Sequence, residues 1–451
     1  MDYHDYLNGM LRINPWMLII NGVLIVHFFV SWHLSALKTG WTIDFWHASL
    51  FLSYFLTFLL MFPFASANLN ALVIGNRNLE FAKRSITTAY LISLTGYLSI
   101  FVGGAIFNYY KFNTLIYGVL IKPVKATLGS LYKQISINRK TSRLVAFFYF
   151  MALGIALLFA FRGGKLNDPR GYYAQNNQFL FLFNFVNSLS GIVSGFLIAR
   201  IFQFNKAVDK MLFALFIAAT LFIGSRGGII GPILGYFTSL VYFKMKGKVN
   251  LLKTVLFALG MLCLILGLSF FRSGDLSVEV VLSSFLIQLF YGNTFSDLRD
   301  FSWVLSVWDG QYFYGKTYMA AFISFIPSSI SAFRSEWSIG KVTAIMAGYS
   351  PKEHPGIRPG MFGESFLNFG IIGVIIIGVL LGYTWRYIDY KIKEAAFTGD
   401  YIEATIAGVA CMIISALPIT AGFFSIYVNI VVYVLLYILR LFFLTYKKNA
   451  V

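Results

Sequence analysis

The sequence predicts an all-α polytopic integral membrane protein with 11 or 12 transmembrane helices and one large outer (periplasmic) loop that contains short helices. Of its 451 residues, 58% are hydrophobic and only 12% are charged, whereas soluble globular domains carry about 25% charged residues. Apolar runs of about 20 residues, the length that spans a bilayer, recur along the chain. Only the stretch 272–362 interrupts this pattern for long.

Eleven apolar segments have the length and composition of transmembrane helices. They cover 15–37, 43–64, 87–107, 143–161, 178–200, 208–224, 227–243, 253–271, 363–386, 402–420 and 422–445. A weaker segment, 112–131, is interrupted by Lys122, Pro123 and Lys125. It is the candidate for a twelfth crossing, which would bring both ends of the chain to the cytoplasmic side. The first apolar run is too long for a cleavable signal and lacks a small-residue cleavage site, so it is expected to be a true span.

The chain therefore divides into three parts. Residues 1–271 are expected to hold the first eight or nine transmembrane helices, residues 272–362 the large outer loop, and residues 363–451 the last three helices. Within the loop, the segments 278–291 and 316–333 have helical length and an apolar face, and we expect them to lie along the membrane surface.

The net charge of +18 indicates which side each loop faces, because cytoplasmic loops retain lysine and arginine. Lysines without acids mark 244–253 as cytoplasmic, and Arg77, Lys83 and Arg84 suggest the same for 65–86. The loop 272–362 then falls on the outer side. The remaining positive charge suits an anionic ligand at the membrane surface. Nucleic acid is a poor match, because the chain has no soluble basic domain.

The sequence contains no pattern typical of a cofactor or a metal. Cys263 and Cys411 both lie in apolar runs, so neither a disulfide framework nor a metal cluster is expected. Phosphate-binding loops and dinucleotide fingerprints are missing from the sequence. His27, His33 and His47 lie on or beside early spans and are expected to serve packing. The glycines at 103–104 and 371–382 are expected to form helix contacts.

Four arginines are expected near one depth at the outer interface. They are Arg162, Arg226, Arg272 and Arg358. The planar guanidinium fork binds two phosphate oxygens at once, so the set is a candidate pyrophosphate site. The alternative is that these side chains extend to lipid headgroups. Arg226 is the stronger candidate because glycines follow it in a tight turn, where backbone N–H groups can approach the same anion.

Two further ionisable residues flank the point where the large loop enters the next span. His354 titrates near neutrality and can donate to phosphate. Glu364 lies about one turn into the span, where an acid is costly unless it is paired or faces a cavity. It can accept a proton from an attacking hydroxyl or orient an arginine. A structural ion pair with Arg358, or a favourable charge at a helix N-terminus, explains it equally well.

Aromatic residues concentrate in the large loop, among them Trp303, Trp308, Tyr312 and Trp337. They are candidates for stacking on sugar rings. The alternative is that they form part of the aromatic belt at a membrane interface.

This layout resembles the Wzy-type O-antigen and oligosaccharide repeat-unit polymerases. The resemblance rests on the number of spans, on the Ser225-Arg226-Gly227 turn, on one large late loop, and on the segment Glu364-Ser365-Phe366-Leu367-Asn368-Phe369-Gly370. The spaced arginine–glycine pattern of some members is not evident here. The ligases that move finished glycan to the lipid A core share the broad architecture.

The resemblance implies a GT-C-like architecture and an inverting glycosyltransferase that needs no metal or other cofactor. The enzyme would move a growing glycan from undecaprenyl pyrophosphate onto the non-reducing-end sugar of a newly delivered repeat unit carried by the same lipid. Its place would be the bacterial inner membrane with the active site towards the periplasm, and a chain-length regulator protein is an expected partner. By position, Arg226 and Arg358 would hold pyrophosphate, with Glu364 beside them.

Three other functions remain open from the sequence. An O-antigen ligase of the same architecture would need a second acceptor for its glycan. A flippase for lipid-linked oligosaccharides would be expected to carry ionisable residues deep in several spans, and few are present. A non-enzymatic scaffold would leave the outer arginines unexplained.

Overall fold

The computed structural model describes residues 14–60, 79–163, 172–173, 180–223, 226–250, 256, 260, 297–327, 330–348, 350, 356–420 and 423–449. All regular elements in these ranges are helical. They are α2 (Pro15–Thr39), α3 (Phe45–Leu50), η1 (Phe51–Leu60), α5 (Leu79–Tyr110), η3 (Ile116–Ile121), α6 (Lys122–Val124), η4 (Lys125–Gly129), α7 (Ser130–Ile137), α8 (Arg139–Arg162), α10 (Leu180–Phe204), α11 (Ala207–Ile223), α12 (Arg226–Ser239), η6 (Leu240–Lys244), α15 (Asp297–Val307), α16 (Lys316–Phe322), α17 (Ala332–Trp337), α18 (Ile339–Met346), α19 (Gly360–Thr398), α20 (Tyr401–Ala416) and α21 (Phe423–Asn449).

Five of the described helices are long and apolar enough to cross a membrane. They are Pro15–Thr39, Ala82–Tyr110, Arg143–Arg162, Phe185–Phe204 and Gly360–Thr398. Shorter apolar helices cover Phe45–Leu60, Tyr401–Ala416 and Phe423–Ile438. The protein is therefore helical and has the character of a membrane protein, as the apolar runs predict. The expected span 253–271 and the segment 278–291 lie outside the described residues, so the total of 11 or 12 stays a prediction.

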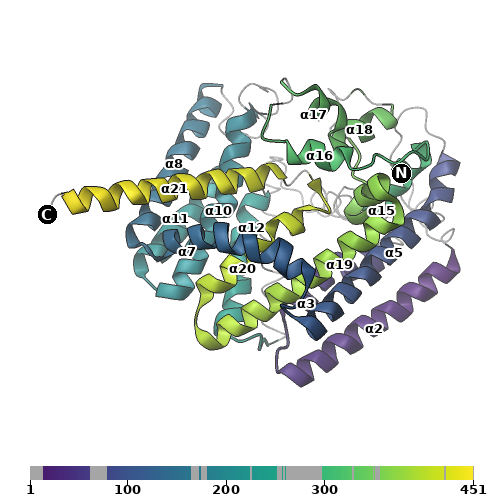
Figure 1. The fold of residues 1–451 in the computed structure, drawn as a ribbon, viewed down its shortest axis with the longest axis horizontal. Coiled ribbons are helices and arrows are strands. Elements are labelled where there is room, and N and C mark those ends of the chain that lie inside the picture. The colour runs from purple at the N-terminus through teal and green to yellow at the C-terminus, as the bar shows by residue number, and fades with distance from the viewer. Residues whose placement is uncertain are drawn as a thin grey trace, which may run out of the picture.

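Two groups of helices are joined through α19 and α20 (Figure 1). In the first group, α2, α3, η1 and α15 pack around α5 and α19, with a core that includes Phe28, Tyr54 and Phe301. In the second group, α7, α8, α10, α11, α20 and α21 share a core that includes Tyr149 and Phe196. The helices α15 to α18 lie together at one end of the first group (Figure 1). We call the described residues 297–350 the large-loop lobe.

Glycines bring α5 and α19 into close contact. A Cβ at Gly382 would meet the backbone of Ile100, and a Cβ at Gly378 would lie 2.5 Å from the carbonyl oxygen of Gly96. A Cβ at Gly103 would meet the backbone of Val379. Small residues let two backbones approach in this way in membrane helices. The glycines at 103 and within 371–382 therefore form helix contacts, and this prediction is confirmed.

Basic side chains gather at the end opposite the large-loop lobe. We call this the lysine-rich end, and it includes Lys38, Lys206, Lys244, Lys246 and Lys393. Its segments are tied to one another by short hydrogen bonds: Ile43 N donates to Gly247 O at 3.0 Å, and Tyr401 N donates to Gln203 Oε1 at 2.8 Å. A collection of lysines at one end agrees with the expected cytoplasmic side.

A buried ionic cluster closes the same end. Lys393 Nζ lies 2.9 Å from Asp44 Oδ2 and 2.8 Å from Asp389 Oδ2. The imidazole Nδ1 of His47 lies 2.7 Å from Asp44 Oδ1, and its ring stacks on Trp32 with ring centres 5.9 Å apart. His47 thus serves packing and hydrogen bonding, as expected of the early histidines.

The segment 112–131, the candidate for a twelfth crossing, forms the short helices η3, α6 and η4 and continues into α7. It begins next to Lys111, whose carbonyl accepts from Tyr383, and ends where Arg200 Nη1 donates to the carbonyls of Ser136 and Asn138. Figure 1 shows α7 lying across the neighbouring helices. Both ends of 112–138 therefore meet the lysine-rich end, where Lys125 pairs with Glu403. A twelfth crossing by 112–131 stays a prediction.

The cytoplasmic placement of 65–86 also disagrees with the arrangement of α5. Ala82 packs against Trp303 of the large-loop lobe, whereas Phe107 packs with residues of the lysine-rich end. The 32 residues of α5 rise about 48 Å at 1.5 Å per residue, which is enough to pass from one end to the other. Residues 82–84 consequently lie at the same end as the large-loop lobe, so the predictions that 65–86 is cytoplasmic and that 272–362 is outside do not fit together in this arrangement. Arg77 lies outside the described residues.

A buried arginine fixes the join between α7 and α10. Arg200 is 2% exposed, and its Nε lies 3.2 Å from Asp209 Oδ1. Its donation to Ser136 O satisfies a carbonyl at the end of α7, where helix carbonyls have no partner of their own.

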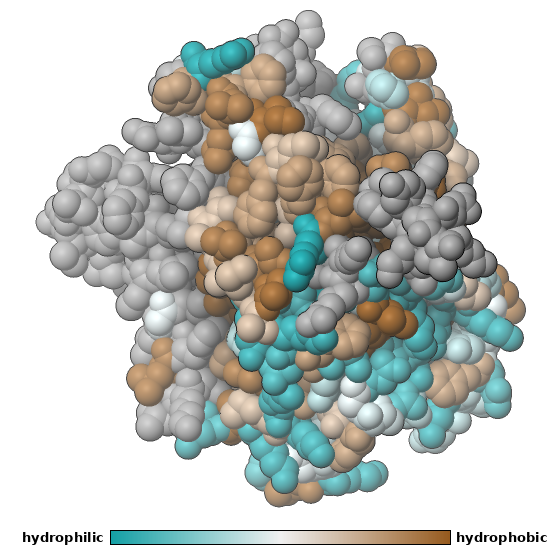
Figure 2. Space-filling model, turned by 90° about the vertical axis from the view of Figure 1, so that its left-hand side faces the viewer, coloured by the Kyte–Doolittle hydropathy of each residue, from teal (hydrophilic) through white to brown (hydrophobic). Residues whose placement is uncertain are grey.

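The distribution of hydrophobic residues on the surface agrees with a protein that sits in a membrane. On the face drawn in Figure 2, hydrophobic residues occupy the centre and hydrophilic residues gather below.

Candidate functional site

The residues around the start of α19 form a polar corner whose geometry depends on a break in that helix. Gly370 has φ 63° and ψ −155°, which no right-handed helix contains. The break frees two carbonyls: Phe313 N donates to Leu367 O at 2.9 Å, and Tyr314 N donates to Asn368 O at 3.1 Å. A Cβ at Gly370 would lie 3.1 Å from Tyr312 Oη. Glycine is required by the positive φ, and the loop 312–314 clamps the break.

Glu364 lies near the start of α19 and is 1% exposed. Thr317 Oγ1 of α16 donates to its Oε1 at 2.9 Å, and Thr420 Oγ1, which follows α20, donates to the same oxygen at 2.8 Å. Asn368 Nδ2 donates to Thr317 Oγ1 and to Glu364 O, both at 2.8 Å. The carboxylate therefore links three segments that are far apart in the sequence. A buried polar group needs such partners to be tolerated.

Two features of this network were not accessible from the sequence. Thr317 and Thr420 lie 47 and 56 positions from Glu364, and no motif marks them. Asn368 follows Glu364 by four residues and therefore lies on the same helix face, which is the one signal that the sequence offers. Its Oδ1 is buried and accepts no hydrogen bond from the residues that the structure describes.

Tyr318 closes this side of the polar corner. Its ring stacks on Phe369 with ring centres 5.8 Å apart. Burial raises the pKa of the Tyr318 phenol, and the charge of Glu364 raises it further. The phenol therefore stays protonated at neutral pH and is a hydrogen-bond donor.

Arg358 is exposed and lies two residues before α19. It faces the first turn of α15, where Asp297 and Asp300 are the acidic residues. Burial and the carboxylate of Asp300 raise the pKa of Asp297, while the charge of Arg358 lowers it. The neighbouring Ile357 is buried, and its N–H donates to Thr343 Oγ1 at 3.0 Å. Arg358 is thus a surface cation on a firmly anchored segment.

Aromatic rings surround the same entry. The ring centres of Trp308 and Tyr312 are 5.3 Å apart, and each ring also meets Phe366, at 5.5 Å and 6.2 Å. Tyr312 is exposed and Trp308 is half-buried. Ile357 packs in the same cluster as Trp308 and Trp337. The segment that carries Arg358 is therefore joined to the aromatic pair through this cluster.

Two predicted glycan-binding residues are placed differently. Trp303 is 3% exposed and packs against Ala82 and Ile86. It lies in the core and presents no face to a sugar, because α15 turns it towards α5. Trp337 is half-buried, and Lys316 Nζ covers its ring at 4.2 Å from the ring centre. A cation on the ring face occupies the surface that a sugar would need.

The other predicted site residues are only partly covered by the structure. Arg162 is exposed at the end of α8. Arg226 is the first residue of α12, and the structure describes its backbone but not its side chain. Arg272 and His354 lie outside the described residues. Of the predicted residues, Glu364 lies near the start of α19, Arg358 just before it, and Trp308 and Tyr312 against Phe366 of the same helix. A shared site for them, and a shared pocket for the four arginines, stay predictions.

Within the described residues, no group of three or more histidine, cysteine, aspartate or glutamate side chains could hold a metal ion. Searches among known proteins give no further direction: no family model, no curated protein and no solved structure matches the chain.

Proposed function

We propose that this protein is a membrane glycosyltransferase that joins glycan repeat units carried on a polyprenyl pyrophosphate. The observation that carries the proposal is that exposed Arg358 directly follows Ile357, which packs in the same cluster as Trp308, just before the start of α19. A cation next to partly exposed aromatic rings suits a ligand that combines phosphate and sugar. The resemblance to the repeat-unit polymerases supports the same reading.

The reaction needs little beyond positioning and charge stabilisation. A hydroxyl of the acceptor sugar forms a bond to the anomeric carbon of the donor, and the bond from that carbon to the pyrophosphate oxygen breaks. The bonding pair leaves with the pyrophosphate, and the hydroxyl proton passes to a base or to water. Negative charge grows on the leaving group, so a guanidinium held beside it lowers the barrier.

Arg358 is the group that we assign to the pyrophosphate. Its charge already acts on the half-buried Asp297, and a phosphate would compete with that carboxyl for the same guanidinium. The anchored backbone at Ile357 limits the movement that binding requires. The fork of an arginine can bind two phosphate oxygens, which a lysine cannot do in the same geometry.

Glu364 is best assigned as a positioning residue. Its Oε1 accepts from two threonine hydroxyls, and the side chain is 1% exposed. A general base must reach the proton that it removes, and here the threonines occupy its oxygens. We propose that Glu364 fixes α16 against the break at Gly370 and so places the aromatic pair.

Reconstituted protein supplied with purified lipid-linked repeat units tests the proposal. Arg358→Ala should leave only single units, while the wild type makes chains, and Arg358→Lys should recover part of the elongation. Arg84→Ala is the control, because Arg84 is also exposed and lies near the end of α5 that packs against the large-loop lobe. Normal chain lengths with Arg358→Ala would defeat the proposal.

The same assay separates the alternatives. Transfer of glycan only after a second, lipid A core acceptor is added would identify a ligase. Movement of lipid-linked units across the vesicle membrane without any new glycosidic bond would identify a flippase. A protein that neither elongates, ligates nor transports the lipid-linked units would be a scaffold. Location in a bacterial plasma membrane, with this corner towards the periplasm, is part of the proposal.

A further inference from the structure

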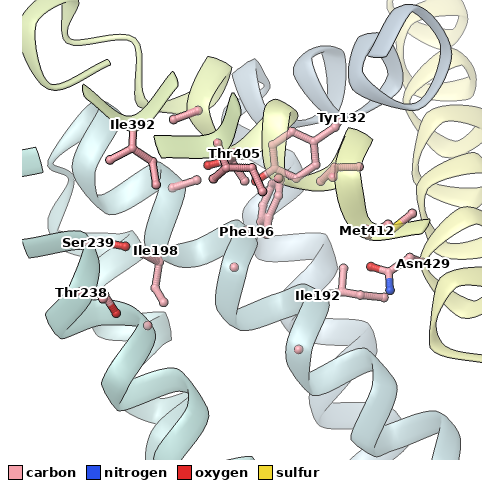
Figure 3. A pocket seen from close by; sticks show the side chains of 18 of the residues that line it. Tyr132, Ile192, Phe196, Ile198, Thr238, Ser239, Ile392, Thr405, Met412 and Asn429 are labelled. Atoms are coloured by element: carbon pink, nitrogen blue, oxygen red, sulfur yellow. The ribbon is translucent and has the colours of Figure 1, made fainter. Parts of the chain in front are cut away.

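A second candidate site lies among the helices of the second group, which includes α10, α20 and α21. A cavity of about 670 Å³ lies between α10, α12, α20 and α21, with residues of α7 and α19 at its rim (Figure 3). Its lining includes Ile192, Phe196 and Ile198 of α10 and Met412 of α20. None of its lining residues belongs to the polar corner around Glu364. The cavity is therefore a separate site.

The described part of the wall carries no charge. Among the lining residues that the structure describes, none is lysine, arginine, aspartate or glutamate. Several polar side chains of the wall donate within their own helices: Thr405 Oγ1 donates to Tyr401 O at 3.0 Å, and Asn429 Nδ2 donates to Ser425 O at 2.6 Å. Thr238 Oγ1 donates to Leu234 O in the same way. A charged ligand would find no partner here and would be costly to bury.

Glycines open the space. A Cβ placed on Gly191, Gly195 or Gly408 would meet no other atom within 4 Å. This differs from the crossing of α5 and α19, where a Cβ on Gly382 would meet the backbone of Ile100. The cavity glycines therefore do not serve close helix contact in this structure. Their missing side chains leave volume that a ligand can fill.

The cavity reaches the surface of the protein between helices. Three lining residues are exposed, namely Gly191 on α10, Thr238 on α12 and Ser425 on α21. The part of α10 that lines the cavity lies within Phe185–Phe204, one of the helices with membrane-spanning character. An opening on such a helix faces lipid when the helix crosses a bilayer.

We propose that this cavity binds a single hydrocarbon chain of a membrane lipid. Its volume lies in the usual range of ligand sites, about 300–1,000 Å³, and its uncharged wall, which includes Ile192, Ile198 and Met412, suits an apolar chain. In a bilayer the chain is held mainly by close packing. This inference does not rest on the proposed glycosyltransferase function.

Photolabelling of the full chain in phospholipid nanodiscs tests the inference. One probe is a phosphatidylcholine with a diazirine near the end of an acyl chain, and the other is a polyprenyl phosphate with a diazirine near the end of its tail. After illumination, labelled peptides are mapped by mass spectrometry. We expect at least one probe to label the cavity segments 187–199 or 404–412. The probe that labels them identifies the lipid that supplies the hydrocarbon chain.

Filling the cavity provides the control. Gly195→Leu and Gly408→Leu place a side chain in the open space and should reduce labelling of these segments at least tenfold. Gly154→Leu on α8 is the matched variant, because a Cβ there also meets nothing within 4 Å and Gly154 does not line the cavity. It should label like the wild type. Thermal unfolding checks that each variant folds.

The outcomes decide the inference. A loss of labelling in either folded filling variant, with labelling kept in Gly154→Leu, supports a chain in the cavity. Labelling that persists in both filling variants, an equal loss in Gly154→Leu, or no labelling of these segments by either probe in the wild type overturns the inference.

Discussion

Replacement of Glu364 by alanine tests the network that joins the large-loop lobe to the membrane helices. The change removes the acceptor of Thr317 Oγ1, at 2.9 Å, and of Thr420 Oγ1, at 2.8 Å. Both hydroxyls belong to buried residues, Thr317 at 0% and Thr420 at 4% exposure. Glu364→Ala should therefore leave two buried donors without their main acceptor and loosen α16 from the break in α19.

The expected magnitude follows from the number of lost bonds. A hydrogen bond to a charged group contributes about 1.5–3 kcal/mol. Two such bonds give about 3 kcal/mol at the lower limit, and the loss is not simply additive because both share Oε1. Glu364→Gln keeps one amide oxygen as an acceptor. It should therefore lose less, about 1 kcal/mol in line with one weakened bond.

The measurement is the free energy of unfolding in mixed detergent micelles, together with the rate at which a protease cuts the large-loop lobe. Glu336→Ala is the control, since Glu336 is an exposed acid on α17 of the same lobe. Glu364→Ala should unfold more easily and expose the lobe, and Glu364→Gln should fall between it and the wild type. Equal stability of Glu364→Ala and Glu336→Ala would refute the reasoning.

Three further predictions concern packing, buried charge and pH. Gly382→Val should destabilise the protein by about 1–3 kcal/mol or more, because its Cβ would meet the backbone of Ile100; Gly154→Val, which meets nothing within 4 Å, should be close to neutral in the same unfolding assay. Arg200→Met should cost about 3–5 kcal/mol, because it leaves a buried acid without its partner at 3.2 Å; a denaturant midpoint equal to wild type would contradict this. Asp297→Asn should stabilise the protein at neutral pH but not near pH 4. The pKa of Asp297 is raised above its ordinary 3.8, so wild-type stability falls as pH rises through that raised value, and the asparagine avoids the loss. Melting temperatures of both proteins across this range test the sign.

The apolar pattern predicted the helices well, because a segment of about 20 apolar residues has few other stable structures in a membrane. It was harder to predict at which end of the protein each connecting segment lies. The segment 112–131 is apolar enough to suggest a crossing, yet it is held by contacts just outside its bounds, where Tyr383 donates to Lys111 O and Arg200 donates to Ser136 O. Lys83 and Arg84 follow Ala82, which packs at the opposite end against Trp303. Such tertiary contacts cannot be predicted from the local charge or from the length of an apolar segment.

The candidate site was predictable in part. Glu364 attracts attention because an acid inside an apolar helix needs a partner, but the sequence suggested Arg358 and the structure supplies two threonines. The break at Gly370 could not be predicted, since glycine also occurs at helix contacts in this chain, as at Gly382. Its cause is the loop 312–314, which meets the freed carbonyls from a distant part of the sequence.

The most direct test of the central claim measures the product length made by reconstituted protein from polyprenyl-pyrophosphate-linked repeat units as the only substrate. We expect long glycans with the wild type and with Arg84→Ala, and single units with Arg358→Ala despite normal folding. Single units with all three proteins, or long glycans with Arg358→Ala, would contradict it.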